Sequence, residues 1–400
     1  MERAQLVTLS IAILMVTTGS LNTIAAKWAD SIVVDGQKFD HPFFQATCMF
    51  IGEFSCLIVF FLLYYIQKRR YNSRNQIGND GAVFDLDDID IEEPKFPNIN
   101  PFIFLPPACC DVLATSLMYI GLNLTTASSF QMLRGAVIIF TGLLSVAFLR
   151  AHLQQFKWLG MIFVTLGLVV VGLCDIYDSS PSEDTNAVIT GDLLIIMAQI
   201  IVAIQMVTEQ VFLEQYDVPP LLAVGLEGLF GMVILSLLMI PMYFIHVPHT
   251  FSHNPFDRLE DVINAFHDIK AQPMIALALT CTIVSIAFFN FAGVSVTKRL
   301  SATSRMVLDS VRTLVIWILS IPLFGEKFIP LQLIGFGFLI LGMFIYNDLL
   351  FGPYIRQHFI PRLSGGPGLF CSRFWGIEVE DTNETSLLEA DLEENLEEQD

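Results

Sequence analysis

Long apolar stretches, each about as long as a membrane-crossing helix, recur along almost the whole of the chain. A helix needs roughly 20 consecutive apolar residues to cross the hydrocarbon of a bilayer. This pattern predicts an all-α polytopic membrane protein with ten transmembrane helices, at Gln5–Ala26, Phe43–Ile66, Pro101–Asn123, Ala127–Leu149, Phe156–Cys174, Gly191–Leu213, Pro219–Ile245, Ala271–Thr297, Ala302–Phe324 and Phe328–Leu349. Most connections are short, so consecutive helices are expected to be antiparallel neighbours.

Two long polar connections and a tail divide the chain. The long connections are residues 67–100 and 246–270. Five of the predicted helices fall within residues 1–175 and five within residues 191–350. Residues 351–400 form a tail that is first rich in Gly and Pro and then acidic, a composition typical of partly disordered segments.

Basic residues predict the orientation of the chain, because cytosolic loops carry an excess of Lys and Arg. With a cytosolic N-terminus, the opposite side holds only Lys27, Lys38, Arg258, Lys270 and Lys327. The cytosolic side then holds a larger set: Arg3, Lys68, Arg69, Arg70, Arg74, Lys95, Arg150, Lys157, Lys298, Arg299, Arg305, Arg356, Arg362 and Arg373. We therefore expect both termini and the 67–100 connection to be cytosolic, and the 246–270 connection to be lumenal.

Composition excludes most soluble classes of protein. The hydrophobic fraction is 54% and the charged fraction 15%, whereas soluble domains carry about 25% charged residues. The net charge of −19 comes mainly from three hydrophilic segments, Asp80–Glu93, Asp175–Asp184 and Glu378–Asp400, which are expected to be solvated. The chain has no basic patch with interleaved aromatic residues, so we expect a lipid bilayer around it and no nucleic-acid partner.

An internal repeat relates the two groups of predicted helices. The segment Ala127–Ser129 aligns with Ala302–Ser304 at an offset of 175 residues. The same offset matches Leu133 with Leu308, Ser145 with Ser320, Gly160 with Gly335 and Gly167 with Gly342, and an offset of 174 matches Glu53 with Glu227. Because five is an odd number, two related groups of five helices must cross the membrane in opposite directions. Many secondary transporters are built from such inverted repeats around a binding site near the bilayer midplane.

Several charged side chains fall inside the predicted helices: Glu53, Asp111, Arg134, Glu209, Glu227, Asp309 and Arg312. An ionised side chain at mid-bilayer costs about 2.5–3.5 kcal/mol on insertion scales, so these groups must pair, become neutral or face water. Structural ion pairs between helices and a polar transport pathway both explain them. For Asp111, near the start of its helix, the structural role is favoured.

Arg134, Asp309 and Arg312 are the most informative of these residues. At the repeat offset, Arg134 corresponds to Asp309, so the two halves place opposite charges at equivalent positions. Asp309 and Arg312 are three residues apart on one helical face and can neutralise each other. Arg134 has no acidic residue within a turn on its own helix, so it needs a carboxylate from another helix or an anionic substrate group.

Acidic residues in the membrane are also candidates for proton coupling. A carboxyl group that faces a transport pathway can bind and release a proton during the transport cycle. Glu53, Glu209 and Glu227 are the candidates here. Gln205 and Glu209 lie four residues apart, on one face of the sixth predicted helix.

Three segments carry a resemblance to a known family: Ala127-Ser-Ser-Phe-Gln-Met-Leu-Arg-Gly-Ala136, Gly191-Asp-Leu-Leu-Ile-Ile-Met-Ala-Gln199 and Arg305-Met-Val-Leu-Asp-Ser-Val-Arg312. Over roughly residues 5–350 the chain resembles subfamily F of the solute carrier 35 family, in the drug/metabolite transporter superfamily. The resemblance implies a secondary transporter with two inverted five-helix repeats that works by alternating access. The implied substrate is a small polar organic solute, such as a nucleotide sugar, a nucleoside or a similar metabolite. Typical nucleotide-sugar carriers have a lysine-bearing motif in the fourth helix, where this chain has Gln131-Met-Leu-Arg134, and this difference argues against a nucleotide sugar.

The resemblance also implies which residues serve the solute. In the family, the third, fourth, eighth and ninth helices line the cavity, which gives a set of candidates for substrate binding or gating: Asn123, Gln131, Arg134, Asn290, Asp309 and Arg312. The fifth and tenth helices often form a dimer contact in the family. The matching glycines of these helices in this chain suit close packing within a protomer or in a homodimer.

Family members similar to this chain are found in lysosomes or other endomembranes, and some in mitochondria. The segment Asn383–Leu388 of the tail is close to an acidic dileucine sorting signal, with Asn where an acidic residue is expected. The resemblance and the tail together suggest a lysosomal or other endomembrane location.

Two other classes of function are considered. A membrane-embedded enzyme is not expected, because all seven histidines lie outside the predicted helices and neither HExxH nor GxSxG occurs. We accordingly expect no catalytic residue, metal or cofactor. A transport-inactive scaffold that recruits partners through its tail is the alternative that the sequence leaves open.

Overall fold

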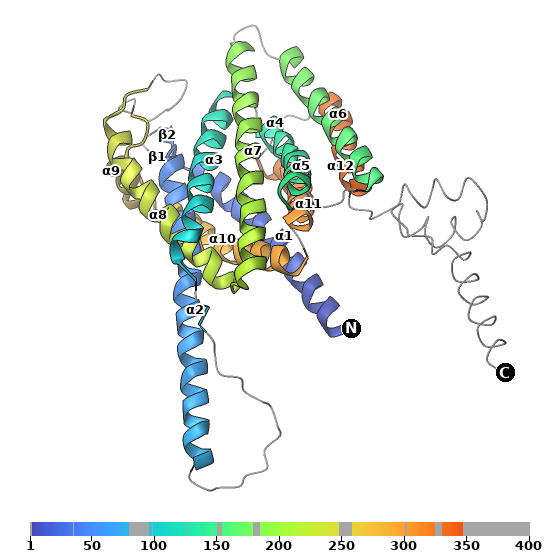
Figure 1. The fold of residues 1–400 in the computed structure, drawn as a ribbon. Helices are drawn as coiled ribbons and strands as arrows, with labels where there is room; N and C mark the ends of the chain where they lie inside the picture. The colour runs from blue at the N-terminus through green and yellow to red at the C-terminus, as the bar shows by residue number, and fades with distance from the viewer. Residues whose placement is uncertain are drawn as a thin grey trace, which may run out of the picture.

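The structure of the protein is a computed structural model, and it describes residues 2–34, 36–79, 96–97, 99–125, 127–149, 154–178, 185–247, 258–300, 302–324 and 330–346. This part of the chain is mostly helical (Figure 1). Its elements are α1 (Glu2–Ser31), β1 (Val33–Val34), β2 (Gln37–Lys38), α2 (Pro42–Asn79), η1 (Pro101–Phe104), α3 (Leu105–Leu124), α4 (Ala127–Leu133), η2 (Arg134–Ala136), α5 (Val137–Leu149), α6 (Gln155–Asp178), α7 (Thr185–Tyr216), α8 (Pro220–Phe244), α9 (Val262–Ala271), α10 (Pro273–Arg299), α11 (Ala302–Phe324) and α12 (Pro330–Tyr346). The two strands pair as a short antiparallel hairpin after α1.

Seven stretches of the described helices are long and apolar enough to cross a membrane: Leu6–Ser31, Pro42–Asn72, Pro101–Leu122, Gln155–Leu173, Val188–Tyr216, Pro220–Phe244 and Pro273–Arg299. Two shorter apolar helices are Arg134–Phe148 and Leu333–Tyr346. Helix α11 fills the ninth predicted position, but Arg305, Asp309 and Arg312 interrupt its apolar sequence. The helical membrane class is therefore confirmed, with seven candidate crossings.

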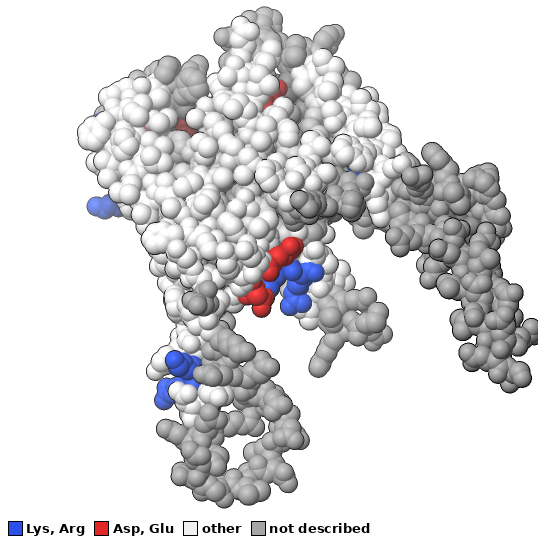
Figure 2. All heavy atoms as spheres, in the orientation of Figure 1, with Lys and Arg blue, Asp and Glu red and all other residues white. Residues whose placement is uncertain are grey.

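The outer surface agrees with a membrane setting. Large apolar side chains such as those of Ile13, Leu62 and Leu237 are more than half exposed on it. Figure 2 shows that the Lys, Arg, Asp and Glu side chains on the visible face lie mostly at the lower end of the helical bundle and on the projecting end of α2. Above them is a broad uncharged band, which suits contact with lipid.

The structure corrects the predicted boundaries in two places. The fourth predicted helix, Ala127–Leu149, is interrupted, because the 3-10 turn η2 separates α4 from α5 and begins at Arg134. Helix α2 extends to Asn79, so the first part of the 67–100 connection is helical. Lys, Arg and Gln favour helix almost as well as apolar residues do, and a helix therefore need not end where its apolar residues end.

The 246–270 connection also contains structure that the polarity pattern missed. Helix α9 begins after Asp261, whose side chain accepts hydrogen bonds from the backbone N–H groups of Ile263 (3.1 Å) and Asn264 (3.0 Å). An aspartate in this N-cap position stabilises the first turn of a helix. The predicted tail, residues 351–400, lies outside the described residues.

The helices pack in a small number of extensive pairs: α6 with α12, α2 with α8, α3 with α7, and α1 with α10. Glycines permit the first of these contacts. A Cβ atom on Gly167 would lie 2.7 Å from the carbonyl oxygen of Gly335, and one on Gly160 would lie 2.8 Å from that of Gly342. The glycines that match in the two halves therefore pack α6 against α12 within one chain.

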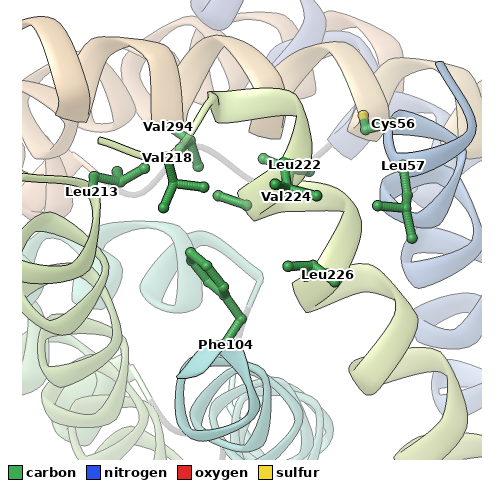
Figure 3. Packing of buried hydrophobic residues seen from close by; sticks show 10 residues of the cluster. Cys56, Leu57, Phe104, Leu213, Val218, Leu222, Val224, Leu226 and Val294 are labelled. Atoms are coloured by element: carbon green, nitrogen blue, oxygen red, sulfur yellow. The ribbon is translucent and has the colours of Figure 1, made fainter. Parts of the chain in front are cut away.

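A compact apolar cluster (Figure 3) lies where the end of α7 and the start of α8 meet α2, at the end of the bundle from which α2 projects in Figure 1. Its buried members come from α2, η1, the α7–α8 corner and α10: Cys56, Leu57, Phe104, Leu213, Val218, Leu222, Ala223, Val224, Leu226 and Val294. We call this set the closing cluster. A second buried cluster, which includes Ala29, Phe39, Ala265 and Ile275, lies toward the opposite end, where α1, the hairpin, α9 and α10 meet.

Candidate functional site

A cavity of about 420 Å³ lies inside the bundle. Side chains from α1, α2, α3, α4, η2, α5, α7, α8, α10 and α11 line it. Apolar and aromatic groups make up much of its wall, among them Phe50, Tyr119, Phe130 and Phe289. Charged groups from α1, α2, α3, η2, α8 and α11 also line it, so the cavity is a chamber with charged groups on its wall, enclosed in an apolar bundle.

The cavity is open at one end and closed at the other. Asp30, near the end of α1, lines the cavity and is exposed, and it accepts a hydrogen bond from Gln45 of α2. The deepest lining residues include Glu53 and Glu227, which are 5% and 6% exposed. One helical turn beyond Glu53 on α2 are Cys56 and Leu57 of the closing cluster. From these exposures we infer that the chamber opens toward the end of α1 and is closed toward the projecting end of α2.

Three charged groups form a chain along one wall. Arg312 Nη2 lies 2.7 Å from Asp309 Oδ1, and Arg134 Nη2 lies 3.8 Å from Asp309 Oδ2. The Arg312 guanidinium lies over the ring of Phe289 at 4.7 Å, and that of Arg134 lies 5.9 Å from the ring of Phe130. The expectation that Arg134 needs a carboxylate from another helix is met by Asp309, at the long end of ion-pair distances.

The position of Arg305 in the structure differs from the sequence-based expectation. Arg305 was assigned to the cytosolic side, but its side chain is 6% exposed and its Nη1 lies 2.5 Å from Glu209 Oε2. The other oxygen of Glu209 accepts a hydrogen bond from Gln205 Nε2 at 3.1 Å. Because α11 begins at Ala302, Arg305 is already one turn inside the helix and faces the bundle. The predicted proximity of Gln205 and Glu209 is confirmed.

Three more carboxyl groups surround this pair. Glu53 accepts a hydrogen bond from Asn290 Nδ2, and Asp111 Oδ1 accepts one from the Thr115 hydroxyl at 3.3 Å. Glu227 Oε1 is buried and has no hydrogen-bond partner among the residues that the structure describes. Within the described residues, no group of three or more His, Cys, Asp or Glu side chains has the arrangement of a metal site.

Most of the predicted site residues meet in this cavity. Its lining includes six of the candidates: Glu53, Arg134, Glu227, Asn290, Asp309 and Arg312. Glu209 does not line it but contacts Arg305, which does. The side chains of Asn123 and Gln131 lie outside the described part of the chain.

Sequence reasoning missed the residues at the mouth of the cavity. Lys27, Asp30 and Gln45 line it. Lys27 and Asp30 follow the first predicted helix and Gln45 is a neutral residue inside the second, so none of them was among the predicted site residues. The signal was present in the three-residue spacing of Lys27 and Asp30, which places two charged groups on one face at the end of α1.

Two family models match the chain. The nucleotide-sugar transporter model matches residues 2–216, and the EamA-like transporter family model matches residues 189–347. Together they cover nearly all of the membrane portion. A solved protein crystal structure is 14% identical and superposes with a TM-score of 0.52, over 86% of this chain and 97% of that one, so it shares the fold.

Several relatives extend over most of the chain. The protein of Homo sapiens named solute carrier family 35 member F6 is 55% identical over 365 residues, which is 90% of this chain and 92% of that protein. The protein of the same name from Mus musculus is 50% identical over 387 residues, 95% of each. An uncharacterized protein of Schizosaccharomyces pombe is 33% identical over 346 residues, 86% of this chain and 98% of that one. The chain therefore belongs to subfamily F of the solute carrier 35 family, in the drug/metabolite transporter superfamily, and is a membrane solute transporter rather than an enzyme.

Proposed function

We propose that the protein is a secondary transporter that moves a small polar organic solute across an endomembrane by alternating access. The observation that carries this proposal is the charged chamber, about 420 Å³ in volume, which opens at one end of the bundle and is sealed at the other by the closing cluster. A carrier needs a site that faces one side of the membrane at a time. The chamber corresponds to a state open toward the end of α1.

The pattern of helix contacts supports two inverted five-helix repeats. We take α1, α2, α3, α4–α5 and α6 as the first half, and α7, α8, α10, α11 and α12 as the second. In this division α1 corresponds to α7, α2 to α8, α3 to α10, α4–α5 to α11 and α6 to α12. The α3–α7 contact therefore corresponds to the α10–α1 contact, and the α5–α7 contact to the α11–α1 contact, and all four contacts are present. The α2–α8 and α6–α12 contacts each correspond to themselves. A two-fold relation between the halves accounts for this regularity.

Arg134 is our leading candidate for contact with the solute. Its guanidinium lies at the break between α4 and α5, lines the cavity and is 22% exposed. Its distance to Asp309 is 3.8 Å, longer than the 2.7 Å contact of Arg312 with the same carboxylate. An acceptor group of a solute can therefore replace Asp309 as the partner of Arg134, which favours a role in binding or gating.

Nucleotide sugars are the solute class that the family match suggests, and nucleosides are a further class that the resemblance of the sequence implies. The nucleotide-sugar transporter model matches the first half of the chain. However, the fourth helix carries Gln131-Met-Leu-Arg134 where typical nucleotide-sugar carriers have a lysine-bearing motif. We therefore place nucleosides and similar metabolites before nucleotide sugars in any screen.

We also propose that transport is coupled to protons through Glu53 or Glu227. Both are buried, line the cavity and lack an ion-pair partner among the described residues. Glu209 is a weaker candidate than the sequence suggested, because Arg305 and Gln205 occupy both of its oxygens. Uptake driven by a pH gradient should fall in Glu227→Gln, and unchanged uptake in both Glu53→Gln and Glu227→Gln would reject the coupling role.

The cellular setting remains as the sequence predicts it. We propose that both termini are cytosolic and that the membrane is lysosomal or another endomembrane, with mitochondria as the alternative. A homodimer through α6 and α12 is also a proposal. Since the matching glycines of these helices already contact each other within one chain, such a dimer would use their outer faces.

Reconstitution in liposomes tests the transport function. The purified protein should take up at least one labelled solute from a panel of nucleosides, nucleotides, amino acids, peptides and amines, and Arg134→Ala should abolish that uptake without unfolding the protein. The alternative is a transport-inactive scaffold that acts through its tail. Absence of any uptake, together with loss of partner recruitment in cells on truncation of residues 351–400, would favour the scaffold.

A further inference from the structure

The deep end of the cavity holds more negative than positive groups. We call Glu53, Asp111, Glu209, Glu227 and Arg305 the floor cluster. Its members come from five helices, α2, α3, α7, α8 and α11, and each acid interacts electrostatically with at least two of the others. A single guanidinium therefore faces four carboxyl groups. Such an excess is expensive inside a membrane unless another positive charge is present.

One of the four carboxyl groups is already satisfied. Arg305 and Gln205 contact the two oxygens of Glu209, which is 1% exposed. For Glu53, Asp111 and Glu227, no ammonium or guanidinium of the described residues lies within ion-pair distance. The hydrogen bonds that Glu53 and Asp111 receive, from Asn290 and Thr115, come from neutral groups.

Glu227 gives independent evidence that the floor lacks a ligand. Glu227 is 94% buried and lines the cavity. Its Oε1 atom accepts no hydrogen bond from the described residues. A buried carboxylate oxygen without a donor is unusual in a native protein and calls for a missing partner.

The other positive groups of the cavity are not placed to supply that partner. Arg134 and Arg312 both contact Asp309, which lies one helical turn above Arg305 on α11. Lys27 lies near the open mouth, close to the end of α1. The floor can therefore be neutralised in two ways, by protons on its carboxyl groups or by a positively charged donor in the cavity.

Building on the proposed transport function, we propose that the floor cluster binds a protonated amine of the transported solute. Glu227, Glu53 and Asp111 accept the N–H groups of the ammonium, and Asn290 holds the Glu53 carboxyl in place. An ammonium group has up to three donors and can bridge several carboxylates at once. The aromatic rings of Phe50 and Phe289, which line the cavity, suit the apolar part of such a solute.

The same arrangement disfavours an anionic group at this depth. A carboxylate or phosphate near Glu53, Asp111 and Glu227 would meet like charges in a medium that screens them poorly. A bound ammonium and bound protons are alternative ways of neutralising these carboxyl groups. The amine and protons should therefore compete, which gives a carrier a direct means of exchanging one for the other.

Three ligands with the same ring and different charge test the proposal. Tyramine carries an ammonium group, tyrosol is neutral, and 4-hydroxyphenylacetate is an anion. Their equilibrium binding to the purified full-length protein in nanodiscs should follow the order tyramine, tyrosol, 4-hydroxyphenylacetate. Tyramine binding should weaken as pH falls, because protons occupy the same carboxyl groups.

Neutral substitutions of similar shape then locate the site. Glu227→Gln should weaken tyramine binding by roughly 30-fold or more, as expected when a buried charge partner is removed, and should leave tyrosol binding nearly unchanged. Asp217→Asn is the matched control, since Asp217 is an exposed acid that pairs with Lys298 outside the cavity. The unfolding midpoint of each variant shows whether it is folded.

The outcomes separate this proposal from the transport function. If tyramine binds no more tightly than tyrosol, or more weakly than 4-hydroxyphenylacetate, the floor does not bind an amine and its carboxyl groups hold protons only. That result on the unmodified protein overturns the proposal even if the variants fail to fold. Uptake of a neutral or anionic solute in liposomes would in that case still support the proposed transporter.

Discussion

At the scale of single residues, the Arg305–Glu209 ion pair holds together two helices that are far apart in the sequence. Both side chains are enclosed, with 6% and 1% exposed, and the contact joins α11 to α7. Removing one partner of a buried ion pair leaves an uncompensated charge, whereas replacing both by apolar groups of similar volume is often tolerated. Loss of one member of the pair should therefore lower the free energy of unfolding more than loss of one member of an exposed ion pair does.

We predict that Arg305→Met lowers the free energy of unfolding by about 3–5 kcal/mol. The double variant Arg305→Met/Glu209→Leu should recover most of that loss, because the Glu209 carboxylate is then no longer left without its partner. The unfolding midpoint in detergent measures both effects. Asp217→Asn, at the exposed Lys298–Asp217 pair, is the control and should melt like the unmodified protein. A double variant as unstable as the single one would contradict the argument.

The candidate site was partly predictable at this scale. Spacing alone paired Asp309 with Arg312. The lack of a local partner for Arg134 predicted either a carboxylate from another helix or an anionic substrate group, and the structure places Asp309 of α11 beside it. Arg305 could not be found in the same way. It follows Lys298 and Arg299 in the sequence and looks like part of a basic loop. The predicted ninth helix already began at Ala302, so Arg305 lay inside it, but its inward direction depends on the packing of α11 against Glu209 of α7, which the sequence alone does not show.

At the scale of helices, α6 and α12 depend on glycines for their close approach. Four glycines lie at the contact, and a Cβ atom on any of them would lie within 3.1 Å of a backbone atom of the other helix: Gly160, Gly167, Gly335 and Gly342. Small residues at such contacts let membrane helices pack closely. Gly337, by contrast, is also on α12 but has no heavy atom within 4 Å of the position of a Cβ.

We predict that Gly167→Leu separates α6 from α12 and lowers the free energy of unfolding by about 1–3 kcal/mol or more, since the new side chain meets backbone atoms. Gly337→Leu makes the same chemical change in open space and should have little effect. Melting curves of the two variants in detergent test the difference. Equal midpoints would mean that the close contact between α6 and α12 is not present in the protein.

The α9 segment is joined to the start of α2 through a buried histidine. His41 Nδ1 lies 2.7 Å from Glu260 Oε1, and Glu260 Oε2 accepts the backbone N–H groups of Phe43 and Phe44. The other ring nitrogen, Nε2, lies 3.3 Å from Asn264 Nδ2 and 3.7 Å from Asp268 Oδ2. Burial lowers the pKa of His41, but the hydrogen bond and charge of Glu260, with the charges of Asp268 and Asp40, outweigh it and raise the pKa above 6.5.

The sign of the pH effect follows from this raised pKa. The folded state binds the His41 proton more tightly than the unfolded state, so the stabilisation is fully present below pH 6.5 and is lost as pH rises through the folded pKa. We predict that the midpoint of the unmodified protein exceeds that of His41→Gln at pH 5 by the equivalent of about 1.5–3 kcal/mol, and that the gap narrows toward pH 8. His246→Gln, at an exposed histidine, is the control. A gap that widens with rising pH would contradict the prediction.

At the scale of the whole molecule, the apolar pattern predicted a helix at every position where the structure has a long one. It did so because a segment that crosses the bilayer forms a helix to satisfy its backbone hydrogen bonds, and its side chains must be apolar over the whole thickness of the hydrocarbon. The break at Arg134, the continuation of α2 to Asn79 and helix α9 left no such run, because they depend on local contacts or lie outside the apolar stretches. The inverted relation between the halves stays a prediction, supported by the repeat offset and the paired helix contacts.

A carrier that works by alternating access must open the closing cluster when the chamber closes at its other end. Single cysteines in a chain whose seven native cysteines are replaced can report this through labelling by a membrane-impermeant maleimide. Thr23 lines the open chamber, so Thr23→Cys should react from the side where α1 ends. Leu222 is 3% exposed in the closing cluster, so Leu222→Cys should react slowly from either side.

During turnover of a transported solute, we predict that labelling of Leu222→Cys from the opposite side rises several-fold while labelling of Thr23→Cys falls. Leu62→Cys is the control, because Leu62 is 57% exposed on the lipid-facing surface and a charged reagent does not reach a thiol in hydrocarbon. A scaffold without transport would keep the closing cluster shut whatever solute is added. Labelling of Leu222→Cys that never changes, in a preparation that takes up solute, would mean that the solute follows another route than the chamber.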